Sequence, residues 1–214
     1  MPLMAEVIGE GRTMARRTRR KAEETRQDVL DMAESVFRDK GFAGTTIADI
    51  AAALGMSPAN VFKHFRSKTA LAEAIAERHV EKMVGALEGI DASLPPLERL
   101  GHFVRRLMES HLRSLQQSPY IFEIVLMTSG WDMACGLRYK ELLESRFVDM
   151  VRLGVAEGAY YSKDIEQTAR CITASFACVL HPVFLVRYPQ EELHIRCDEV
   201  VEFVNKSLTN PLAK

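Results

Sequence analysis

The sequence predicts an all-α protein of about nine helices, with a small N-terminal three-helix unit and a larger C-terminal helical unit. Apolar residues recur at spacings of three and four along most of the chain, which is the periodicity of a helix face. Gly, Pro, Ser and Asp residues, which begin and end helices, separate these segments. No strand-like alternation competes with this pattern. With 214 residues, 47% of them hydrophobic, the chain can bury a sizeable core.

The first predicted helix forms one wall of the N-terminal unit. Its buried stripe consists of Val29, Leu30, Ala33, Val36 and Phe37. The helix is expected to end at Gly41, because glycine adopts the left-handed conformation of a helix end without strain. Phe42 follows and is expected to close the core of this unit.

A basic segment precedes the first helix. We expect residues 1–20 to form an arm without regular structure, as chain termini often do. Seven basic residues occur between positions 12 and 26, namely Arg12, Arg16, Arg17, Arg19, Arg20, Lys21 and Arg26. Such an arm adds phosphate contacts to a nucleic-acid binder. The alternative is a tail that only improves solubility.

Residues 45–68 predict two short helices joined by a tight turn. Apolar residues at i, i+3, i+4 and i+7 form the buried face of the first, namely Ile47, Ile50, Ala51 and Leu54. Gly55 ends this helix, and Ser57 with Pro58 begins the next. Val61 and Phe65 bury the second helix, so its opposite side faces solvent. A helix held in this way can present its side chains to the major groove of DNA.

The segment GMSPANVFKHFRSK resembles the recognition segment of the TetR family of transcriptional repressors, and the resemblance extends over about residues 23–70. It implies a homodimeric repressor that binds a pseudo-palindromic operator and is released by a small-molecule effector. It also implies a DNA-binding domain at 21–68 and an effector-binding and dimerisation domain at 69–210. The family usually has tyrosine at Phe62, whose hydroxyl contacts a phosphate, so Lys63 or His64 is expected to compensate here.

Four residues are predicted to contact bases. Asn60 can pair with an adenine edge and Lys63 can reach a guanine, whereas Pro58 and Ala59 offer apolar contact to a thymine methyl group. The predicted phosphate contacts are Thr45, Thr46, Phe62, His64 and Lys68. The two threonines lie at a helix N-terminus, and Lys68 matches the phosphate-contacting lysine of the family. His64 is alternatively a half-buried, hydrogen-bonded residue.

The rest of the chain is predicted as six more helices, at about residues 67–89, 94–117, 118–129, 132–158, 164–187 and 189–208. The last two carry more apolar surface than one partner face requires. A four-helix interface between two copies explains this excess, and two-fold dimers are the commonest soluble oligomers. The alternative is that both helices belong only to the core.

By the same resemblance, an effector pocket is expected between the fifth and eighth helices. The candidate lining residues are His102, Phe103, Arg106, His111, Tyr120, Phe122, Met127, Trp131, Tyr139 and Phe176. Such a lining suits a hydrophobic or aromatic effector. Aromatic and methionine residues at helical spacing are more often ordinary packing.

Other functions receive less support. Cys171, Cys178 and His181 share a face of the eighth helix, but i and i+7 are about 10 Å apart, too far for one metal ion. No nucleophile turn or glycine-rich loop indicates an enzyme, and no cofactor is predicted. Neither a membrane-spanning run nor a signal peptide is expected, which places the protein in the cytoplasm. The alternatives are a helical small-molecule binder and a protein-regulated DNA-binding protein without effector-driven release.

Overall fold

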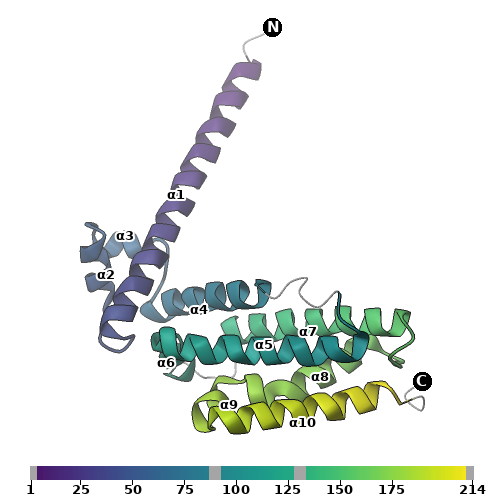
Figure 1. Ribbon diagram of the computed structural model, residues 1–214. Coiled ribbons are helices and arrows are strands. Elements are labelled where there is room, and N and C mark those ends of the chain that lie inside the picture. The colour runs from purple at the N-terminus through teal and green to yellow at the C-terminus, as the bar shows by residue number, and fades with distance from the viewer. Residues whose placement is uncertain (1–3, 87–92, 128–133, 211–214) are drawn as a thin grey trace. The chain divides into compact units, whose positions relative to one another are not determined.

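The computed structural model describes residues 4–86, 93–127 and 134–210, and this part of the chain contains helices and no strand (Figure 1). The all-α prediction is confirmed. Two compact units can be distinguished, residues 1–75 and 76–214, and the division falls inside α4 after Ile75. The helices are α1 (Met4–Lys40), α2 (Ile47–Ala53), α3 (Pro58–Phe62), α4 (Lys68–Gly85), α5 (Pro96–Gln117), α6 (Pro119–Met127), α7 (Ala134–Ala156), α8 (Ile165–Leu180), α9 (Pro182–Arg187) and α10 (Gln190–Leu208).

In the N-terminal unit α2 packs against α1, and α3 packs against α2. The predicted stripe of α1 is buried, apart from Val36, which is partly exposed. Phe37 and Phe42 pack edge to face with ring centroids 5.4 Å apart. Ile50 and Val61 are fully buried and bring α2 and α3 into the same core.

The turn between α2 and α3 follows the sequence signals. Gly55 has a φ of 64°, in the left-handed region that glycine adopts without strain. The Met56 amide donates to the Ala51 carbonyl at 2.9 Å, so the end of α2 is closed by a bond that spans the turn. Pro58 then begins α3, where its missing N–H has no consequence for the helix.

The first helix is longer than predicted. Residues 4–20, which we expected to lack regular structure, continue α1 back to Met4. Strong helix formers dominate this segment, and no proline follows Pro2 before α1 ends. Gly9 and Gly11 each weaken a helix by only about 1 kcal/mol relative to alanine. Local propensity therefore favours helix over an irregular arm.

The predicted eighth helix is divided in two. His181 is extended, with φ −76° and ψ 135°, and separates α8 from α9. The cause is Pro182, because proline disfavours a helical conformation in the residue before it. The His181 ring nitrogen Nδ1 accepts a bond from the Val183 amide and so caps α9.

The C-terminal unit is a helical bundle in which α7 packs on α8 and α10 packs on both α5 and α8. Its centre is aromatic: Phe147 lies between Phe103 and Phe176, with ring centroids 5.7 and 5.9 Å away. At one end the buried Arg99 of α5 forms two hydrogen bonds to Glu157, at 2.7 and 3.0 Å. These contacts fix the ends of α5 and α7 to each other.

One helical run is more apolar than we expected from the sequence. By length and composition alone, Ile165–Arg187 could cross a membrane, with a mean hydropathy of 1.7 in a window that is 33% buried. The core helix of a globular protein meets the same criterion. Here the run is interrupted at Pro182, and its first part, α8, packs against α7 and α10.

Candidate nucleic-acid interface and interior site

The outer face of α3 carries the predicted base contacts. Pro58, Ala59, Asn60 and Lys63 are all exposed, whereas Val61 between them is fully buried. Phe62 is also exposed, with 51% of its surface accessible. The buried Val61 thus fixes which side of the helix faces outward.

Two of these side chains contact each other. The ammonium group of Lys63 donates a hydrogen bond to the Asn60 side-chain carbonyl Oδ1 at 3.0 Å. The residues are three positions apart, so their side chains lie next to one another on the helix surface. The two predicted base contacts therefore form a pair.

Thr46 begins α2 and is already hydrogen-bonded within the unit. Its hydroxyl accepts from the Asp49 amide at 3.1 Å, and the Asp49 carboxylate accepts from the Thr46 amide at 2.8 Å. This reciprocal cap, with Lys40 3.3 Å away, lowers the pKa of Asp49 from 3.8 to about 2, chiefly through the Thr46 hydrogen bonds. A phosphate at Thr46 must compete with this carboxylate.

The structure corrects the prediction for Thr45. This side chain is 1% exposed, and its hydroxyl donates to the Gly41 carbonyl at 2.8 Å. It therefore stabilises the connection between α1 and α2 and does not present its hydroxyl to a phosphate. The sequence did not distinguish Thr45 from Thr46 because either can cap a helix.

Lys68 holds the same connection from the other side. Its ammonium group donates to the carbonyls of Phe42 and Thr45 at 2.8 and 2.9 Å, and it lies 4.4 Å from the centre of the Phe42 ring. A structural role is therefore established for this lysine, and its phosphate contact stays a prediction. His64 is half-buried beside the turn.

The C-terminal unit holds a polar pair made by buried His111 of α5 and half-buried Tyr139 of α7. His111 is buried, and its Nε2 is 2.6 Å from the Tyr139 hydroxyl. Burial lowers the pKa of His111 to about 3, so its ring is neutral at physiological pH, and burial also raises the pKa of Tyr139. One turn further along α5, Ser114 is 3.2 Å from Nε2 of His79 on α4.

Several of the predicted pocket residues are buried in the C-terminal unit, and others are not. Phe103, Phe122 and Phe176 are buried, and so is Tyr120. Arg106 is exposed, which removes it from the interior set, and His102 is half-buried. The side chains of Met127 and Trp131 lie outside the described residues. Sequence reasoning missed Phe147, His79 and Ser114, although Phe147 continues the apolar periodicity of α7 through Leu143 and Val151.

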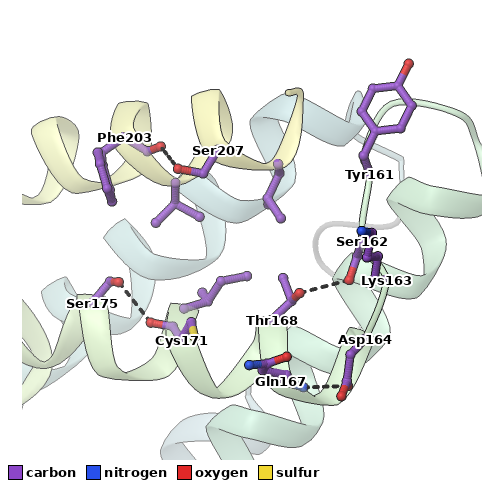
Figure 2. Close-up of a pocket in the computed structure, with 13 residues that line it drawn as sticks. Tyr161, Ser162, Lys163, Asp164, Gln167, Thr168, Cys171, Ser175, Phe203 and Ser207 are labelled. Carbon is purple, nitrogen blue, oxygen red and sulfur yellow. Dashed lines mark hydrogen bonds between the residues drawn. The ribbon is translucent and has the colours of Figure 1, made fainter. Parts of the chain in front are cut away.

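A groove of about 390 Å³ lies elsewhere, between α8 and α10, and none of the predicted pocket residues lines it (Figure 2). Phe203, which is 66% exposed, forms part of its α10 wall, opposite Cys171 and Ser175 of α8. The Ser175 and Ser207 hydroxyls donate to carbonyls of their own helices, at 2.8 and 3.0 Å. The groove therefore offers mainly apolar surface. No cluster of three or more metal-ligating side chains occurs among the described residues.

Comparisons with known proteins agree with this arrangement. Residues 29–75, which contain α2 and α3, match the family described as bacterial regulatory proteins of the tetR family. Residues 96–201 match the tetracyclin repressor-like C-terminal domain. The chain belongs to the TetR family. The prediction made from the recognition segment is thereby confirmed.

The TetR-family chain is 36% identical to the transcriptional regulator AcrR of Shigella flexneri over 100 residues, 45% of this chain and 46% of that one. It is 27% identical to the transcriptional repressor KstR2 of Mycolicibacterium smegmatis, over 63% of this chain and 67% of that one. The AcrR match thus spans about half of that protein. A TetR-family regulator from Pectobacterium atrosepticum shares the fold, with 22% identity, a TM-score of 0.66 and coverage of 90% and 98%.

Proposed function

We propose that this protein is a transcriptional repressor that binds a pseudo-palindromic operator as a homodimer and is released by a small-molecule effector. The main support for this proposal is the exposed face of α3. It presents polar and apolar side chains to solvent, and buried Val61 holds the helix in place. Its membership of a family of DNA-binding regulators supports the same function. These regulators are generally non-enzymatic, and we place this one in the cytoplasm with its operator.

Base contact is assigned to Pro58, Ala59, Asn60 and Lys63. Exposed Phe62 lies beside them and has no hydroxyl, so we assign it apolar contact with DNA rather than a hydrogen bond to phosphate. We assign phosphate contacts to Thr46, His64 and Lys68. At Thr46 the phosphate has to compete with the Asp49 carboxylate.

The groove between α8 and α10 supports the dimer. Exposed apolar side chains occur on the last two helices, at Val183 and Val186 of α9 and at Ile195 and Phe203 of α10. Soluble monomers seldom leave such surface uncovered over one region. A second copy of the chain, related by a two-fold axis, covers this apolar surface. In such a dimer the same surface of each subunit is buried against the other.

The buried polar pair indicates the class of effector. The aromatic rings of Phe103, Phe147 and Phe176 favour a hydrophobic or aromatic molecule, and the neutral His111 with Tyr139 can exchange hydrogen bonds with a hydroxyl or carbonyl group on it. Tyr139→Phe should therefore weaken the response to a hydroxylated aromatic compound more than the response to its unhydroxylated analogue.

Selection of the purified protein from a random duplex pool tests the function. The expected result is a two-fold symmetric site with half-sites about one helical turn or more apart. A panel of aromatic compounds is then tested for release of that site by fluorescence anisotropy. Failure of every compound favours the alternative of a DNA-binding protein regulated by a protein partner. If no sequence is enriched, the result favours the alternative of a helical small-molecule binder whose N-terminal unit does not recognise a DNA sequence.

A further inference from the structure

The contact between Asn60 and Lys63 determines what these side chains offer to a base. An asparagine amide has one carbonyl acceptor and two N–H donors, whereas a lysine ammonium has three donors and no acceptor. In the structure one of the lysine donors is bonded to the only acceptor oxygen of the amide, at 3.0 Å. The second lone pair of that oxygen lies next to the ammonium group, so the outward side of the pair presents mainly donors and a positive charge.

Adenine and guanine differ in how well they suit such a pair. In the major groove guanine presents two acceptors, N7 and O6, whereas adenine presents the acceptor N7 and the donor amino group N6. To pair with adenine through both atoms, Asn60 must accept from N6 at Oδ1, next to the lysine ammonium. The ammonium repels the partly positive amino hydrogens and attracts guanine O6.

We propose that Asn60 and Lys63 act as one hydrogen-bonded unit that recognises guanine, and that Lys63 prevents the pairing of Asn60 with adenine. This rests on the proposed function of α3 as the base-reading helix. It replaces the separate assignments of Asn60 to adenine and Lys63 to guanine. Both side chains are exposed on a helix whose orientation Val61 fixes, so the pair is formed before DNA arrives.

Operator selection with three variants tests the proposal. Asn60→Ala identifies the position that the pair reads, because the base preference relaxes there. Lys63→Met keeps most of the length of the side chain but removes the ammonium, which frees Oδ1 of Asn60 to accept from adenine. We expect the wild type to select guanine at this position. In Lys63→Met the ratio of the affinities for the adenine and guanine duplexes should rise by about tenfold or more. Lys140→Met, which removes an exposed lysine on α7, should leave the preference unchanged.

A second measurement uses the wild-type protein and a modified duplex. Replacing the guanine with 7-deazaguanine removes the N7 acceptor. The affinity of the wild type for the duplex should then fall, whereas the affinity of the double variant Asn60→Ala/Lys63→Met should not change. A wild-type site with adenine at this position, or the same base preference in Lys63→Met, overturns the proposal and leaves operator binding intact. If no symmetric site is enriched, the proposed function and this inference both fail.

Discussion

At the scale of single residues, Lys68 shows how a side chain that resembles a DNA contact also stabilises the fold. Its two bonds to the carbonyls of Phe42 and Thr45 join the start of α4 to the loop before α2. We expect Lys68→Met to lower the free energy of unfolding by about 1.5–3 kcal/mol, the range for hydrogen bonds to a charged group. Urea unfolding measures this free energy, and Lys63→Met, which changes an exposed lysine, is the control. Equal stability of the two variants would contradict a structural role.

Asp49 gives the N-terminal unit a dependence on pH. The pKa of its carboxyl is about 2 in the folded protein, below its ordinary value of 3.8. The ionised group therefore stabilises the fold above about pH 4, and this contribution is lost as the pH falls through about 2. The melting temperature of the wild type should exceed that of Asp49→Asn near neutral pH, and the difference should shrink in acid.

The Asp28→Asn variant removes an exposed carboxylate from α1 and controls for the change in net charge. Thermal melts at pH 6 and near pH 2 provide the comparison. A difference between the wild type and Asp49→Asn that stays constant over this range would mean that the reciprocal cap with Thr46 is not formed in solution.

At the scale of elements, Gly154 sets how closely the end of α7 approaches the segment after it. The ring of Tyr160 occupies the space that a side chain at this position would need, and the Tyr160 hydroxyl donates to the Pro96 carbonyl at 2.6 Å. We expect Gly154→Ala to destabilise the protein by about 1–3 kcal/mol, as overpacking of a core does.

Gly136→Ala is the matched control, because Gly136 lies on the same helix and has no neighbouring atom within 4 Å of the added carbon. This change should stabilise α7 by up to about 1 kcal/mol through helix propensity alone. Opposite shifts in the denaturation midpoint are the expected result. Stabilisation by both variants would mean that the Tyr160 ring moves aside at little cost.

At the scale of the whole molecule, dimerisation depends on the surface along α8, α9 and α10. Phe203→Glu places a charge in the centre of the proposed interface, where it would be desolvated without a partner. We expect this variant to sediment as a monomer and to lose most of its operator affinity, because a single head contacts only one half-site. Leu137→Glu changes another exposed apolar residue, on α7, and should remain dimeric. A dimeric Phe203→Glu would exclude this surface as the interface.

The sequence located most helix boundaries because their signals are local. Pro96, Pro119 and Asp164 stand at or next to the starts of α5, α6 and α8, and Gly55 ends α2, as predicted. The errors were local as well. The structure starts α1 earlier than predicted because helix propensity outweighs terminal position there, and Pro182 divides a helix that the sequence predicts as one.

The candidate site was only partly predictable. The exposed face of α3 followed from the periodicity of Val61 and Phe65, which also identified Asn60 and Lys63 as outward-facing. The hydrogen bond between those two was not predicted, although their spacing permits it. Helix periodicity does separate interior His111 from exposed Arg106, because His111 follows Phe103 and Leu107 at intervals of four on the buried face of α5 and Arg106 lies off that face.

By itself, the sequence determined the fold class, the helix-turn-helix segment and the family, because each depends on the order of residues within a short window. The tertiary structure decided the burial of Thr45, the structural contacts of Lys68, the pairing of His111 with Tyr139 and the groove between α8 and α10. These features join residues that are distant in the chain, or depend on which side of a helix its neighbours cover. Local patterns carry no information on either until the helices have packed.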